Sequence, residues 1–214
     1  MNQELQREQG DPRSRVLKRF IKNMGILIFV MFSLWALWEM YAKEAPGDYS
    51  TREGDIRLSE RNYDEALASF NRALRERPNH RGALMGRALV FIQTKQYDKA
   101  TAELTYLIDY LKKNLEPDDP TGAGVMAAAY ANRGIVHDTK GRYPEALADY
   151  IEALRTDQGA VDGPGIIDKV IYGTPNPSTV RTRAIYLKEQ LALPPEKRLL
   201  RVPEIDAEQR MHKP

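Results

Sequence analysis

The sequence predicts an all-α protein: an N-terminal transmembrane helix, a right-handed α-solenoid of about three helix pairs, and a C-terminal capping helix. Three observations predict this fold. Residues 24–42 form one long apolar run, three similar stretches recur after it, and an amphipathic segment follows a region rich in glycine and proline. Helix pairs that repeat along a chain bury their apolar faces against neighbouring pairs, so the repetition predicts a solenoid.

The composition excludes several classes of chemistry. The 214-residue chain has 32 Lys and Arg against 30 Asp and Glu, and a formal net charge of +2 does not favour nucleic-acid binding. The chain has no cysteine, which excludes disulfides, thiolate metal sites and cysteine nucleophiles. We therefore expect membrane and protein contacts and no nucleic-acid partner.

The first apolar run, MGILIFVMFSLWALWEMYA over residues 24–42, has the length of a transmembrane helix. Its 19 residues span roughly 28 Å at about 1.5 Å each, close to the ~30 Å hydrocarbon core of a bilayer. Trp35, Trp38 and Tyr41 gather at one end, as in an interfacial aromatic belt. A cleaved signal peptide is the alternative, but Lys43 stands where the cleavage site needs a small residue.

The charges on either side of this run predict its orientation. Residues 1–23 carry six basic and three acidic side chains, whereas only Lys43 and Glu44 follow the run closely. By the positive-inside rule, the basic N-terminus is cytoplasmic. We therefore expect a single-pass protein of the bacterial inner (cytoplasmic) membrane, with everything after Ala42 in the periplasm. An organellar protein whose repeats face the cytosol is the alternative topology.

Three stretches resemble one another: RNYDEALASFNRAL, KQYDKATAELTYLI and GRYPEALADYIEAL. In each, a Tyr is followed three residues later by an Ala and then by apolar residues at helical spacing. Tyr63 and Tyr97 are 34 residues apart, and Tyr143 follows after a further 46. A period of 34 residues is typical of stacked helix pairs. The predicted array covers residues 47–160, and the extra residues 115–126 form a helix overrun and a loop.

These residues resemble the tetratricopeptide repeat family, in which each unit is a pair of helices. The first unit, residues 47–80, matches at Gly54, Tyr63, Ala66, Phe70, Ala73 and Pro78. The second, residues 81–114, matches at Leu84, Ala88, Phe91, Tyr97, Ala100, Leu104 and Leu107. The third, residues 127–160, matches at Tyr130, Gly134, Gly141, Tyr143, Ala146, Tyr150 and Ala153. We expect these residues to pack helices together and not to contact a ligand.

The resemblance implies protein–protein interaction through a concave groove. In that family, the first helices of successive units line a groove that holds a peptide or a helix of a partner protein. Carried over by position, the predicted lining is Thr51, Asp55, Leu58, Met85, Leu89, Ile92, Gln93, Ala131, Asn132, Ile135, Asp138 and Thr139. Some family members grip a terminal carboxylate with Lys, Arg and Asn. Only Asn132 and Arg52 fit that pattern here, so a carboxylate clamp is disfavoured.

The C-terminal part is predicted to complete the array. Residues 161–177 are rich in glycine and proline and are expected to be irregular. Because they include the apolar stretch IIDKVIY, either this segment or an external partner fills the groove. A capping helix, residues 178–193, is expected to begin at Ser178 and to bury Val180, Ala184, Leu187 and Leu191. The polar tail, residues 194–214, is expected to be extended, as a disordered or partner-binding segment.

The sequence has no pattern typical of catalysis or metal binding. His80, His137 and His212 are far apart, and none has a second ligand at zinc spacing. Asp118 and Asp119 lie between two prolines and are expected to be solvated. We therefore expect no enzyme activity, no metal and no cofactor.

The predicted function follows from the membrane segment and the array together. We expect a membrane-anchored scaffold that binds a partner protein as an assembly or accessory factor of a cell-envelope complex. The layout resembles bacterial membrane-anchored repeat proteins that assist the secretion translocon or cytochrome assembly. The alternative is a stable structural subunit of a respiratory or transport complex, with the transmembrane helix as its main contact.

Overall fold

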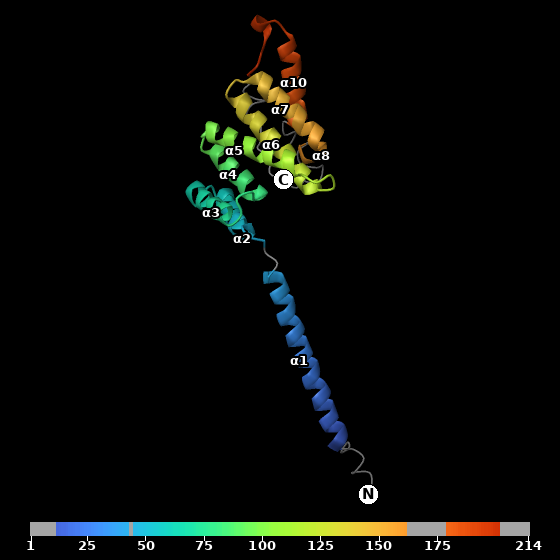
Figure 1. Cartoon of the computed structure of the whole chain (residues 1–214). Helices are drawn as coiled ribbons and strands as arrows, with labels where there is room; N and C mark the ends of the chain where they lie inside the picture. The colour runs from blue at the N-terminus through green and yellow to red at the C-terminus, as the bar shows by residue number, and fades with distance from the viewer. Residues whose placement is uncertain (1–11, 43–44, 162–178, 202–214) are drawn as a thin grey trace. The chain divides into compact units, whose positions relative to one another are not determined.

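The computed structural model describes residues 12–42, 45–161 and 179–201. The chain divides into two units, Met1–Ala45 and Pro46–Pro214. The described parts of both units contain helices and no strands (Figure 1). The all-α prediction is therefore confirmed.

The first unit contains one long helix, α1 (Pro12–Ala42, 31 residues). Its segment Arg15–Glu39 has a mean hydropathy of 1.9 and is not buried inside the protein, so α1 is long and apolar enough to cross a membrane. The helix begins before the apolar run at Met24, so basic residues that precede the run are helical too. Pro12 accounts for this start, because proline is favoured in the first turn and Lys and Arg are good helix formers.

The described part of the second unit contains three helix pairs stacked in chain order (Figure 1). They are α2 (Asp48–Ser59) with α3 (Tyr63–Glu76), α4 (Arg81–Gln93) with α5 (Tyr97–Asn114), and α6 (Pro120–Thr139) with α7 (Tyr143–Thr156). The second helix of each pair packs on the first helix of the next pair. The first helices also contact one another, α2 with α4 and α4 with α6. This is the arrangement of an α-solenoid.

The predicted insertion at residues 115–126 is mostly helical, which corrects the position of the expected loop. Helix α5 runs to Asn114 and α6 already begins at Pro120, so the connection comprises only residues 115–119. Asp119 explains the early start of α6: its Oδ1 accepts a hydrogen bond from the Gly122 amide at 2.7 Å, which caps the helix. The extra residues thus lengthen α5 and α6.

Aromatic side chains of the second helices pack against glycines of the first helices. The Phe70 ring lies so close to α2 and α4 that a Cβ added at Gly54 would be 2.6 Å from it, and one added at Gly86 would be closer still. In the third pair, a Cβ at Gly134 would be 2.7 Å from the Tyr150 ring. Glycine is therefore required at these points because the helices approach too closely for a side chain.

The turn inside each pair has the same backbone geometry. Arg61, Lys95 and Gly141 have positive φ angles of 63°, 58° and 74°. In the first turn, the Asn62 amide donates to the Arg57 carbonyl at 2.8 Å, and the other two turns repeat this bond with distances of 2.7 and 2.8 Å. These are Schellman motifs, which end a helix with one residue in the left-handed region. Only the third turn uses glycine there.

The C-terminal residues of the described structure pack on the third pair. Helix α8 (Gln158–Val161) contacts α6 and α7, and α10 (Val180–Ala192) contacts α7. Thr179 caps α10, one residue after the expected position, since its Oγ1 accepts from the Thr182 amide at 3.1 Å. A short 3₁₀ helix, η1 (Pro195–Lys197), follows. Of the four residues that were expected to be buried on α10, Val180, Ala184 and Leu187 are buried, whereas Leu191 is only half-buried.

Several predicted segments fall outside the described residues. They are residues 1–11 of the N-terminus, nearly all of the Gly/Pro segment 161–177, the expected cap Ser178, and residues 202–214 of the tail. The expectation that residues 161–177 occupy the groove therefore lies outside the described residues as well.

Candidate functional site

All twelve predicted groove residues lie on α2, α4 and α6, the first helices of the three pairs. Burial divides them into two groups. The buried group, at most 8% exposed, consists of Thr51, Met85, Leu89, Ala131, Asn132, Ile135 and Asp138. The open group consists of four half-buried residues, Asp55, Leu58, Ile92 and Thr139, and the exposed Gln93. Only the open group is accessible to a partner that approaches from solvent.

Asp138 pairs with the protein's own C-terminal helix, in contrast to the expectation that it faces a partner. Arg183 of α10 donates from Nε to Oδ2 at 2.7 Å and from Nη2 to Oδ1 at 2.8 Å. The Tyr150 hydroxyl donates to the same carboxylate at 3.2 Å, and Arg183 also donates to the Leu200 carbonyl at 3.1 Å. A buried carboxylate requires such a counter-charge, because removing it from water alone is costly.

Asn132 is also unavailable for the role that the family pattern suggests. It is fully buried, and its Nδ2 donates to the sulfur of Met85 at 3.5 Å. A terminal carboxylate from solvent has no access to this amide. The structure thus adds a physical reason to disfavour a carboxylate clamp.

A polar contact that the sequence analysis did not predict connects α4 to α3 and α5. Arg87 donates from Nη2 to both carboxylate oxygens of Glu103 on α5, at 2.7 and 2.9 Å. It also donates from Nη1 to Asn71 Oδ1 on α3, at 2.8 Å. Burial raises the pKa of Glu103, and the nearby Arg87 opposes that rise. One arginine therefore joins three helices.

The same contact recurs one pair later. Arg133 of α6 donates to both oxygens of Asp149 on α7, at 2.7 and 2.9 Å, and to Thr105 Oγ1 on α5 at 3.0 Å. The hydrogen bonds to Asp149 raise the pKa of Arg133. In both pairs the carboxylate follows the arginine by 16 residues. That repeated spacing was the signal in the sequence that could have revealed the contact.

Asp119 differs from the solvated carboxylate that the sequence suggested. In addition to capping α6, it forms an ion pair with Arg81 at the start of α4. The hydrogen bond from the Gly122 amide lowers the pKa of Asp119, and Arg81 lowers it further. Asp119 therefore joins the second pair to the third.

The two histidines within the described residues serve the fold. His80 caps α4, because its Nδ1 accepts from the Ala83 amide at 3.2 Å while Nε2 donates to Asp48 Oδ1 at 2.8 Å. His137 is buried, with its Nε2 3.6 Å from an oxygen of Asp149. Among the described residues, no three His, Asp or Glu side chains are grouped to hold a metal ion. His212 lies outside the described residues.

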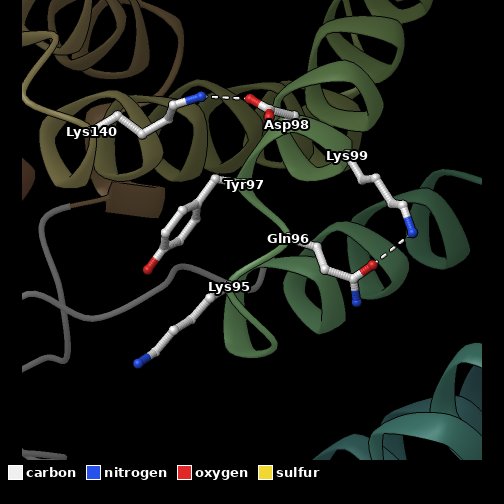
Figure 2. A pocket seen from close by; sticks show the side chains of 6 residues that line it. All are labelled: Lys95, Gln96, Tyr97, Asp98, Lys99 and Lys140. Carbon is white, nitrogen blue, oxygen red and sulfur yellow. Dashed lines mark hydrogen bonds and ion pairs between the residues drawn. The ribbon is translucent and has the colours of Figure 1, made fainter.

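A shallow depression of about 360 Å³ lies at the turn between α4 and α5 (Figure 2). Three of its charged groups are engaged with neighbours: Lys140 pairs with Asp98 at 2.5 Å and Lys99 donates to Gln96 at 2.7 Å. In Figure 2, Lys95 and Lys99 point away from the Lys140–Asp98 pair. The lysines therefore do not converge on one point where an anion would be held.

Comparison with known proteins supports the resemblance of the repeats to the tetratricopeptide repeat family. Residues 51–109 match the model of the tetratricopeptide repeat family. Among similar solved structures, the TPR domain of Arabidopsis OM64 is 20% identical with a TM-score of 0.45, covering 60% of this chain and 92% of that chain. The first TPR of Spaghetti (RPAP3), bound to the HSP90 peptide SRMEEVD, is 14% identical with a TM-score of 0.49, covering 70% and 97%. No curated protein matches the chain in sequence.

The tetratricopeptide repeat match begins within α2 and ends within α5, so it includes the first two pairs. Tetratricopeptide repeats typically mediate protein–protein interaction, and the fold is generally a non-catalytic scaffold. In this array, the open group of groove residues belongs to the three first helices.

Proposed function

We propose that the protein is a membrane-anchored tetratricopeptide repeat scaffold that binds a partner protein, as an assembly or accessory factor of a cell-envelope complex. The observation that carries this proposal is the sequence of elements: a helix able to cross a membrane is followed at once by a repeat array. Helix α1 ends at Ala42 and α2 begins at Asp48.

The proposed location is the bacterial inner membrane, with the N-terminus in the cytoplasm and the array in the periplasm. The basic residues that precede the apolar run support this orientation. The natural absence of cysteine allows a direct test with single cysteines and a maleimide that cannot cross membranes. In intact spheroplasts, Arg52→Cys should react and Arg15→Cys should not. The reverse pattern would contradict the proposed orientation.

The proposed contact surface is the open group of groove residues. Leu58 and Ile92 are half-buried apolar side chains, whereas Asp55, Gln93 and Thr139 are polar. Apolar area and a few polar groups on adjacent helices suit a peptide or helix that presents apolar anchors. The buried group is not part of this surface, because its side chains already pack or pair within the protein.

A photoreactive residue at Gln93 tests this function. Because Gln93 is exposed on α4, its replacement should leave the fold intact. We expect adducts with one membrane or envelope protein, and we expect Ile92→Asp to abolish them. The matched control is a photoreactive residue at Tyr106, which is exposed on α5 and outside the groove. If Gln93 forms adducts only with residues 161–177 of its own chain, the groove is self-occupied and the partner-binding function fails.

A stable subunit of a respiratory or transport complex is the second candidate. The exposed apolar side chains of α1 favour it, since they offer a long surface for packing inside a membrane complex. Extraction in mild detergent separates the two candidates. An accessory factor should dissociate from its partner, whereas a structural subunit should co-purify in constant stoichiometry. Replacing residues 15–39 with an unrelated transmembrane helix should abolish assembly only for the subunit.

A further inference from the structure

The first helix of a pair packs on the preceding pair through one face, which we call the stacking face. On α4 this face contains Ala83, Arg87 and Val90. Ala83 and Val90 are at most 1% exposed and share a core cluster with Phe70 of α3. Arg87 contacts the same helix through Asn71. Helix α3 therefore buries the two apolar residues of the stacking face of α4 and contacts the partly buried Arg87 between them.

The stacking face of α6 has the same composition. Its residues are Ala129, Arg133 and Val136, each 46 positions after its equivalent on α4. Ala129 and Val136 are fully buried, and Arg133 reaches Thr105 of α5. Each of these two stacking faces is therefore covered by the second helix of the preceding pair. In both cases that helix places a polar side chain against the arginine at the centre of the face.

The equivalent residues of α2, which lie 34 positions before those of α4, are Tyr49, Glu53 and Ile56. Tyr49 is 65% exposed and Ile56 is 58% exposed. No helix pair precedes α2 among the described residues of the array. Two large apolar side chains therefore stand in solvent at positions that are fully buried in the other two pairs.

The charge at the centre of this face is reversed relative to the other two. Glu53 takes the position that Arg87 and Arg133 occupy in the later pairs. Arg72 contacts Glu53 at Oε2, at 2.9 Å, and both side chains stay partly exposed. A carboxylate has two oxygens and accepts hydrogen bonds from more than one cation. A helix that covers this face would thus meet an acidic centre.

We propose that the stacking face of α2 docks an α-helix of a partner protein, with a Lys or Arg opposite Glu53 and small or apolar residues opposite Tyr49 and Ile56. The occupant is a helix because the two equivalent faces each hold one. Its cation follows from the charge of Glu53. This inference rests on the proposed scaffold function and adds a second contact surface, distinct from the groove.

Helical peptides test this inference directly. The probe is the sequence of residues 63–77, which includes the helix that covers the stacking face of α4, stapled on its solvent side to hold it helical. It is made in two forms, with Asn71→Lys or Asn71→Glu. Fluorescence anisotropy measures the binding of each form to the full chain in phosphatidylcholine nanodiscs, with empty nanodiscs as background.

We expect the Lys peptide to bind at least threefold more tightly than the Glu peptide, and high salt to reduce this difference. Glu53→Lys should reverse the preference, and Ile56→Asp should abolish binding of both peptides. Gln93→Asp is the matched control, since it adds the same charge to an exposed position in the groove and should change neither affinity. Equal affinities, or a preference that Glu53→Lys leaves unchanged, would overturn the inference.

A dye attached at Ile56→Cys identifies the other possible occupants of this face. Energy transfer between differently labelled copies would show that a second copy of the chain covers it. Quenching by brominated lipids would show that it lies in the bilayer. Either result would overturn the inference. The Gln93 crosslinking experiment is independent of this face, so failure of the docking inference and failure of the proposed function are distinguishable.

Discussion

Arg183 and Asp138 form a two-point ion pair in the interior of the array, although they are 45 residues apart in the chain. Arg183 is 1% exposed and Asp138 is 4% exposed. Because both side chains are buried, the charge of each is compensated by the other and not by water. The C-terminal helix α10 therefore belongs to the folding unit of the third pair.

Replacing one member of this ion pair should lower the free energy of unfolding much more than replacing both members. Arg183→Met leaves a buried carboxylate without its counter-ion and should lower the free energy of unfolding by about 3–5 kcal/mol. Adding Asp138→Asn should recover a large part of that loss. Urea unfolding of the detergent-solubilised protein, followed by circular dichroism, measures both. The control is Arg181→Met, an exposed position on the same helix. Equal losses for the single and double variants would contradict a coupled pair.

The left-handed turn residues should respond to glycine in opposite ways. Arg61 and Lys95 hold positive φ angles that cost a non-glycine residue energy, whereas Gly141 adopts the same conformation freely. We expect Lys95→Gly to raise the free energy of unfolding by about 0.5–1 kcal/mol and Gly141→Ala to lower it by about 1 kcal/mol. Thermal unfolding compares the two variants with the wild type. Destabilisation by Lys95→Gly would show that its side-chain contacts outweigh the backbone conformation.

The contact between Phe70 and two glycines predicts a steric rescue. Gly86→Ala would place a methyl group into the Phe70 ring and should destabilise the array by about 1–3 kcal/mol. Combining it with Phe70→Leu should cost less than the sum of the two single changes, because the smaller side chain leaves room. Gly159→Ala is a matched control, since its added methyl group would meet only an ordinary contact at 3.4 Å. Strict additivity in a double-mutant cycle would contradict the proposed clash.

His137 should make the array less stable in mild acid. Burial lowers its pKa from the ordinary value of 6.5; Asp149 and Glu145 oppose this effect, and Arg133 and Arg142 add to it. The unfolded chain therefore binds the proton first as the pH falls. The contribution of His137 to stability is complete above about pH 6.5 and is lost progressively below it.

Unfolding experiments between about pH 7.5 and 5 measure this effect. We expect the free energy of unfolding to fall more steeply with decreasing pH for the wild type than for His137→Gln. His80→Gln serves as a comparison at the other histidine of the array. Parallel curves for the wild type and His137→Gln would show that His137 is not the group responsible.

The periodic features of the array were accessible from the sequence. The Tyr residues that mark the repeats begin α3, α5 and α7, because their spacing reflects the length of one helix pair. Of the three glycines that pack against aromatic rings, Gly54 and Gly134 followed from the same register, whereas Gly86 was not among the predicted matches. Local signals of this kind suffice when a structure repeats the same packing along the chain.

Contacts that depend on three-dimensional placement were not accessible in this way. No spacing rule connects Asp138 with Arg183, since their meeting depends on where α10 packs. The burial of Asn132 and Met85 likewise depends on tertiary packing that single-helix periodicity cannot show. The early start of α6 likewise depends on a contact that the sequence does not reveal. Asp119 is expected from the sequence to be solvated, whereas in the structure it caps the helix.

The distance in sequence between Asp138 and Arg183 has a consequence for biosynthesis. When the ribosome has completed α6, the aspartate that this helix will bury has no counter-ion, because Arg183 lies 45 residues after Asp138 in the chain. The third pair thus reaches its final packing only late in translation. A polypeptide that terminates before residue 183 would expose this unmet charge, and would offer proteases a loosened third pair beside two completed ones.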